Sequence, residues 1–153
     1  MFKNILVAVA EGPGADAVFA HALSLARLTE ARLIVLHALS AEQQPAHAFV
    51  HDNDSNWVDY MQRWKRREHE GSTLLQHLHQ QAAHAHVPVE ILQQTGSPGP
   101  TICRGAQEQQ ADLIVVGRRV GPDGLPLGST STFVLHHAPC AVQTVPLQAD
   151  ATP

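Results

Sequence analysis

Short apolar segments recur along the chain and are separated by longer segments with helical periodicity. The apolar segments are residues 5–9, 33–37, 89–92, 113–116 and 141–145. A short apolar run between two helical segments is typical of a strand in a parallel sheet, because each crossover returns the chain through a helix. The pattern therefore predicts an α/β fold with a single open five-stranded parallel sheet and helices on both faces.

The intervening segments predict four helices. They are expected to begin after residue 14, near residue 57, after residue 98 and near residue 129. The second is long, because its apolar positions keep gaps of three, four or seven residues up to residue 85. Residues 40–56 have no sustained period and contain Pro45, so we expect a mobile excursion there that can cover a pocket at the carboxyl ends of the strands.

The segment after the fourth apolar run has the composition of a phosphate-binding loop. Its glycines allow sharp bends and close approach to a ligand; they are Gly117, Gly121, Gly124 and Gly128. A helix that begins near Ser129 would direct free backbone N–H groups and the positive end of its dipole at a bound anion. An ordinary strand-to-helix turn with a Ser or Thr cap has the same composition, so both interpretations stay open at this point.

Composition narrows the class of protein. With 153 residues, 44% hydrophobic content, 16% charged content and a formal charge of −4, the chain is expected to form one compact soluble domain over residues 1–147, followed by a short tail at 148–153. The basic run at 63–67 is followed by acidic residues, which favours a solvated helix face over nucleic-acid binding. The N-terminal apolar run is too short for a signal peptide or a membrane span, so we expect a cytoplasmic protein without membrane contact.

Few residues in the sequence indicate catalysis or metal binding. Cys103 and Cys140 have no metal-ligand spacing and are read as small buried hydrophobic residues. The histidines of the long helix lie too far apart along one face to share a metal, so no metal site is predicted. His136 and His137 are read as helix C-terminal residues that favour the dipole there. No Walker sequence and no nucleophile elbow is present, so we predict no catalytic residue.

Four stretches of the chain resemble the universal stress protein family between Ile5 and Val145. They are ILVAVA, LIVLHAL, QTGSPGPTICRGAQEQQADLIVVGRR and LGSTSTFVLHHAPCAVQTV. The resemblance implies a Rossmann-like sheet similar to that of the adenine nucleotide alpha hydrolases. It also implies a homodimer formed through the last strand, Ala141 to Val145, and, in one branch of the family, a bound ATP or AMP with magnesium.

The resemblance also implies a set of contact residues. Carried over by position, the base and ribose contacts fall on Ala8, Val9, Ala10 and Ala38. The phosphate contacts fall on Gly117, Arg119, Gly128, Ser129 and Thr130, and Arg118 is a second source of positive charge. All of these positions lie at or just after the carboxyl ends of predicted strands, where open parallel sheets bind their ligands.

Two positions depart from the nucleotide-binding branch. Ala10 stands where an acidic residue typically closes the first strand, so neighbouring Glu11 would have to supply the acceptor. Val120 stands where a second glycine belongs, and seven residues separate it from Gly128 where nine are usual. We therefore expect a stress-response module that senses adenine nucleotide, with a nucleotide-free dimeric protein-interaction module as the alternative. A slow ATP hydrolase or autophosphorylating protein is a weaker third interpretation.

Overall fold

The computed structural model describes residues 1–40, 54–120 and 126–148. The strands are β1 (Asn4–Val9), β2 (Arg32–Leu39), β3 (Val89–Thr95), β4 (Leu113–Val120), β5 (Pro126–Leu127) and β6 (Ala141–Gln148). The helices are α1 (Ala15–Thr29), α2 (Asp54–His84), α3 (Pro98–Glu108) and α4 (Ser129–His137). Most of the expected excursion at 40–56 lies outside the described residues, as do Gly121 and Gly124.

The sheet has the predicted parallel architecture. Five parallel strands lie in the order β3-β2-β1-β4-β6, with Ile5 opposite Leu33 on one side and Leu113 on the other. The two-residue β5, which the sequence pattern did not predict, pairs antiparallel with the end of β4. The other strands are longer than their apolar runs. β2, β3, β4 and β6 continue the ladder at their carboxyl ends, and in β3 and β4 the added residues are mostly polar.

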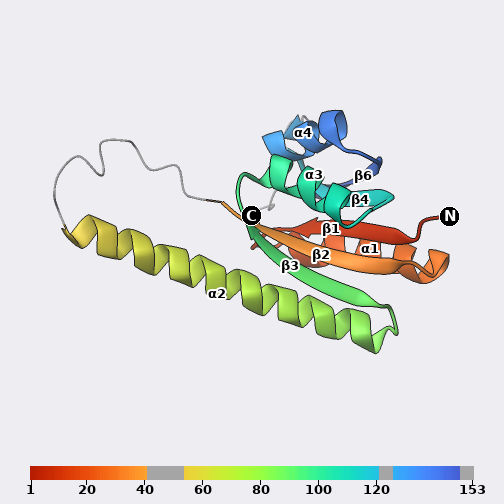
Figure 1. The fold of residues 1–153 in the computed structure, drawn as a ribbon, viewed down its shortest axis with the longest axis horizontal. Coiled ribbons are helices and arrows are strands. Elements are labelled where there is room, and N and C mark those ends of the chain that lie inside the picture. Colours follow the sequence, from red (N-terminus) through yellow and green to blue (C-terminus); the bar gives the residue numbers. More distant parts are fainter. Residues whose placement is uncertain (41–53, 121–125, 149–153) are drawn as a thin grey trace.

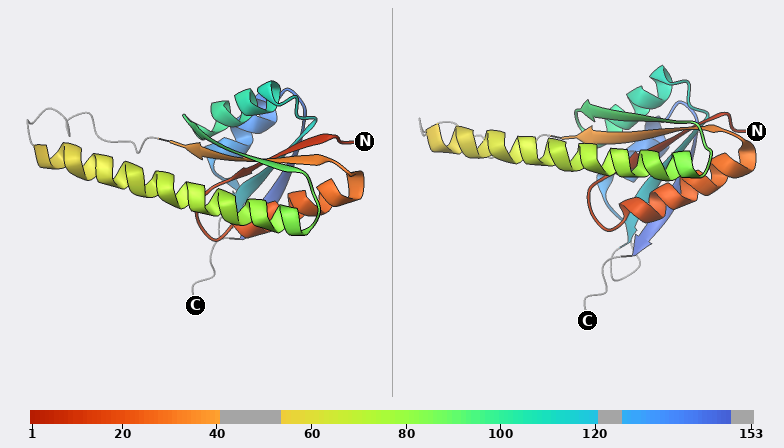
Figure 2. Two further views of the ribbon diagram at one scale, coloured as in Figure 1. Left: turned by 60° about the horizontal axis from the view of Figure 1, so that its bottom comes forward. Right: turned by 90° about the horizontal axis from the view of Figure 1, so that it is seen from below.

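Two hydrophobic cores lie on opposite faces of the sheet. Under α1 and α2 the core is built on alternate residues of the strands, such as Val7, Val35 and Val115. The intervening residues, such as Leu6 and Ile34, form the second core under α3 and α4. Figure 1 shows α3 and α4 above the sheet, and Figure 2 shows α1 and α2 together on the other face. Burial on both faces explains why the central residues of β1, β2 and β4 are apolar on both sides of the strand.

The second helix is longer than the sheet it covers. α2 has 31 residues, which corresponds to about 46 Å. Its C-terminal half packs on the sheet through Leu75, Leu78 and Ala82, whereas its N-terminal part extends past the sheet (Figure 1), where Trp57 is 56% exposed. Within the described ranges, no helix combines the length and the apolar character needed to cross a membrane.

Candidate functional site

The chain leaves the sheet in opposite directions after β1 and after β4. These two strands are neighbours, but β1 leads through α1 to β2 on one side, whereas β4 leads through α4 to β6 on the other side. Ligands of open parallel sheets bind at such a switch point, beyond the carboxyl ends of the strands. The candidate site therefore consists of the ends of β1 and β4, the turn at residues 10–14 and Gly128 at the start of α4.

The predicted base and ribose residues are divided between the two faces of the sheet. Ala8 and Ala38 are half-buried and pack against the core under α3 and α4. Val9 is buried in the opposite core, so only its backbone is available at the switch point. Ala10 is exposed just beyond β1. The structure thus brings Ala8 and Ala38 together on one face and leaves the Val9 side chain on the other.

Gly117 lies within a strand, and the prediction that it begins the glycine-rich loop is wrong. β4 continues to Val120, and Gly117 pairs with Val145 of β6. A Cβ added at Gly117 would lie 2.7 Å from Leu147 Cδ1 and 3.0 Å from Val18 Cγ2. The side chains of β6 and α1 therefore pack closely over Gly117, and a larger residue here would require Leu147 to shift.

The start of α4 has the features expected of an anion site. Gly128 is the N-cap residue and has φ 117° and ψ 137°, a conformation that residues with a side chain rarely adopt. Ser129 is exposed and Thr130 is half-buried, whereas Ser131 is buried. Among the described residues, no side chain hydrogen bond caps this helix. The predicted helix start near Ser129 is confirmed, and the first N–H groups and the positive end of the dipole lie at this end of α4.

Strand alternation assigns the two arginines to different faces. Arg118 follows Val116 by two residues, and Val116 belongs to the core under α3 and α4. Arg119 follows Gly117 by two residues and therefore lies on the same face as Gly117, which packs against Val18 of α1. Arg118 is half-buried and Arg119 is exposed. Arg118 therefore shares the face of the α4 N-terminus, Ala8 and Ala38, whereas Arg119 does not.

Glu11 is held by a histidine that the sequence analysis did not single out. Its Oε1 atom lies 2.9 Å from Nε2 of His37, whose side chain is 3% exposed. His37 belongs to the α1 and α2 face, because it follows Val35 by two residues in β2. Glu11 therefore does not replace the acidic residue missing at Ala10. The signal in the sequence was a lone polar residue inside the apolar run LIVLHAL.

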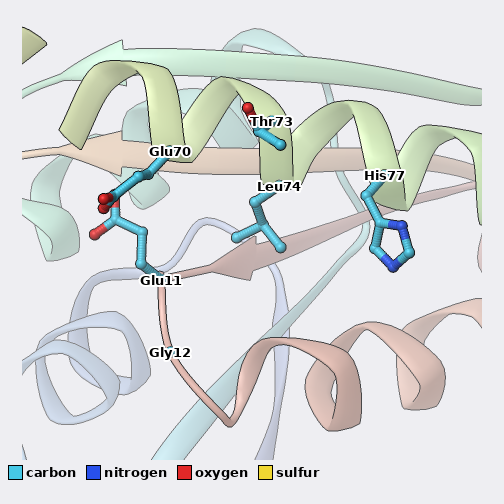
Figure 3. A pocket seen from close by; sticks show the side chains of 6 residues that line it. All are labelled: Glu11, Gly12, Glu70, Thr73, Leu74 and His77. Atoms are coloured by element: carbon cyan, nitrogen blue, oxygen red, sulfur yellow. The ribbon is translucent and has the colours of Figure 1, made fainter. Parts of the chain in front are cut away.

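A shallow groove lies on the same face as Glu11. It has a volume of about 350 Å³ and is lined by Glu11, Gly12, Glu70, Thr73, Leu74 and His77. Figure 3 shows the Glu70 side chain of α2 pointing toward Glu11 at the end of β1. None of the predicted nucleotide contacts lines this groove. It is therefore separate from the face that carries Ala8, Ala38 and the start of α4.

The described residues provide little nucleophilic chemistry. Cys103 and Cys140 are free thiols that pack against the core under α3 and α4. Burial raises the pKa of the Cys103 thiol; burial, followed by the negative charge of Asp112, raises the pKa of the Cys140 thiol. Both are therefore poor nucleophiles at neutral pH. His136 and His137 lie in the last turn of α4, at the opposite end from Ser129, as predicted.

Comparisons with known proteins agree with this architecture. A model of the universal stress protein family matches residues 1–146. A universal stress protein of Synechocystis sp. is 30% identical over 151 residues, covering 94% of this chain and 97% of that protein. The structure of universal stress protein UspA from Lactobacillus plantarum aligns with a TM-score of 0.75 at 27% identity, covering 94% and 97% of the two chains.

A second solved structure extends the comparison. A universal stress protein family protein from Arabidopsis thaliana, solved with AMP bound, aligns with a TM-score of 0.67 at 24% identity. The alignment covers 99% of this chain and 95% of that chain. At this level of identity the likeness shows a common fold.

Proposed function

The chain belongs to the universal stress protein family, and we propose on this premise that it binds an adenine nucleotide, ATP or AMP with magnesium, at the switch point between β1 and β4. The observation that carries the proposal is the start of α4. Gly128 turns the chain with a positive φ, and the uncapped helix N-terminus at Ser129 follows it. A phosphate at this point would accept hydrogen bonds from backbone N–H groups and interact with the helix dipole.

Three further features support a nucleotide at this point. Arg118 lies on the face of α4 and supplies a positive charge that suits phosphate. Ala8 and Ala38 leave room beside the ends of β1 and β2, because neither extends beyond a methyl group. The Arabidopsis relative of the same fold binds AMP. We place the base and ribose over Ala8, Ala10 and Ala38, and the phosphates at Gly128, Ser129 and Thr130.

We further propose that occupation of the site regulates binding of a protein partner during stress in the cytoplasm. A ligand changes such an interaction only when it binds one conformation of the protein better than another. Denaturing freshly purified protein and separating the supernatant by chromatography tests the first step. We expect AMP or ATP to be released; protein that holds none and acquires none on incubation with ATP would refute nucleotide binding.

One observation favours a second candidate function, a nucleotide-free dimeric protein-interaction module. Ala10 offers no side-chain acceptor for a ribose hydroxyl, and the carboxylate of Glu11 is engaged by His37 on the other face. A site without this acceptor forms fewer hydrogen bonds with the ligand. If the chain is such a module, its oligomeric state should be the same with and without ATP, and its affinity for a protein partner should not change with nucleotide.

We propose that the dimer forms through residues Ala141 to Val145 of β6. β6 pairs with β4 on one side and stands at an edge of the five parallel strands. Pro146 has no N–H group to donate to β4, so its backbone nitrogen fits the side of β6 that faces away from β4. Thr144, two residues earlier, shares that side, and its N–H group is therefore available to a second copy of the chain.

Replacing Thr144 with proline is expected to separate the dimer without breaking the ladder between β6 and β4. The substitution removes one outward N–H group, and the dimer dissociation constant should rise at least about tenfold. Light scattering over a dilution series measures the change. Thr144→Val keeps the N–H group and should remain dimeric. A Thr144→Pro variant that dimerises as tightly as the parent would place the interface elsewhere.

A further inference from the structure

A buried histidine connects four segments of the chain. His37 of β2 is 2% exposed. Its Nε2 atom lies 2.9 Å from Glu11 Oε1, and its Nδ1 atom lies 3.3 Å from Nε2 of Gln93 in β3. The same Gln93 nitrogen donates a hydrogen bond of 3.1 Å to the carbonyl oxygen of Glu68 in α2. His37 thus joins the turn after β1 to β2, β3 and α2.

The donors and acceptors in this network are matched. An amide nitrogen can only donate, so the two hydrogens of Gln93 Nε2 are directed at His37 Nδ1 and at the Glu68 carbonyl. His37 Nδ1 therefore accepts, and Nε2 carries the hydrogen that is donated to Glu11. Hydrogen bonds to an ionised carboxylate are stronger than those between neutral groups. The network therefore holds the Glu11 carboxylate firmly.

The long helix leaves no space beside His37. A Cβ added at Gly71 of α2 would lie 2.5 Å from His37 Cε1 and 2.5 Å from Gln93 Nε2. A glycine is required here because the backbone of α2 passes directly over the imidazole and the amide. His37 is therefore fixed by packing as well as by hydrogen bonds.

Glu11 is the side-chain anchor of the turn at residues 10–14, and Gly14 packs closely against Leu147. The sequence of the turn is Ala-Glu-Gly-Pro-Gly, so Glu11 is the one residue in it whose side chain can form a hydrogen bond. Within the turn, the Ala15 N–H group approaches the Gly12 carbonyl only at 3.4 Å, and Gly12 has φ 121°. Two glycines give this segment large conformational freedom. Glu70 also points toward Glu11 (Figure 3), and its like charge would repel a Glu11 carboxylate that His37 did not hold.

We propose that Glu11 and His37 form a latch that positions the β1–α1 turn and thereby sets the affinity for the adenosine part of the nucleotide. This inference rests on the proposed nucleotide site, one side of which is the exposed Ala10 and the turn that follows it. Glu11 acts through the turn and does not touch the ligand. Glu11 and His37 are thus positioning residues on the face of the sheet opposite to the bound nucleotide.

The latch is tested with Glu11→Ala, Glu11→Gln and Glu70→Gln. Glu11→Ala should raise the amide hydrogen exchange rates of residues 12, 14 and 15 in the free protein about tenfold. It should also weaken the binding of adenosine, AMP and ATP by the same factor of about ten. Glu11→Gln keeps an oxygen that accepts from His37, so its rates and affinities should stay within about threefold of the parent. Glu70→Gln removes a carboxylate from the same groove without breaking the latch and should slow exchange or leave it unchanged.

Failure of the latch and failure of the proposed function give different results. If the parent protein binds no nucleotide, the claim that the latch sets nucleotide affinity is refuted. The exchange rates of the free Glu11→Ala protein still decide whether the latch holds the turn. Unchanged exchange in Glu11→Ala would overturn the latch. A loss confined to ATP, or an equal loss in Glu11→Gln, would overturn positioning of the adenosine part. Thermal unfolding of each variant shows that the measurements report folded protein.

Discussion

Replacing Gly128 with valine is expected to weaken ATP binding about 10- to 100-fold while the protein stays folded. Gly128 has φ 117°, and no atom lies within 4 Å of a Cβ placed there, so the cost comes from the backbone and not from a clash. Holding a valine in this conformation costs about 1–3 kcal/mol, which the chain relieves by moving the start of α4. The first N–H groups of the helix then no longer converge on the phosphate. Calorimetric titration with ATP measures the loss.

Gly12→Val is the matched control for this change. Gly12 has φ 121° and equally open surroundings, but it lies in the turn after β1. We expect Gly12→Val to lower the affinities for adenosine and for ATP by similar factors. Gly128→Val should lower the affinity for ATP far more than the affinity for adenosine. Undiminished ATP binding in Gly128→Val would show that the phosphates bind elsewhere.

Replacing Phe19 with alanine is expected to lower the free energy of unfolding by about 3–5 kcal/mol. Phe19 is fully buried in the core between α1 and the sheet. Its removal leaves a cavity and loses apolar contacts, and typical domains are stable by only about 5–15 kcal/mol. Urea denaturation followed by circular dichroism measures the change.

Leu28→Ala provides the control on the same helix. Leu28 is 76% exposed, so its truncation should change the free energy of unfolding by less than about 0.5 kcal/mol. A Phe19→Ala protein as stable as the parent would contradict the assignment of this side chain to the core.

The sheet and three helix starts could be predicted from the sequence for simple physical reasons. Strands covered on both faces are apolar throughout, so they stand out between helical segments. Proline, glycine and serine mark the starts of helices, as at Pro98 and Ser129, because they suit the first turn or the residue before it. The division of the core between two faces also follows from strand alternation once the order of the strands is known.

The end of β4 and the latch could not be predicted. Gly117 resembled the first residue of a loop because glycine and two arginines follow an apolar run. Its packing against Leu147 involves a residue 30 positions later in the chain, and only the fold brings the two together. His37, Gln93 and Gly71 meet in space through the β2–β3 register and the path of α2. Single-residue patterns carry no information about such long-range contacts.

The most direct test of nucleotide binding is a calorimetric titration of nucleotide-free parent protein with ATP and magnesium. We expect saturable binding of one nucleotide per chain with a dissociation constant on the order of 1–10 µM. Absence of heat at all concentrations, together with absence of bound nucleotide by equilibrium dialysis, would contradict the account and favour the nucleotide-free interaction module.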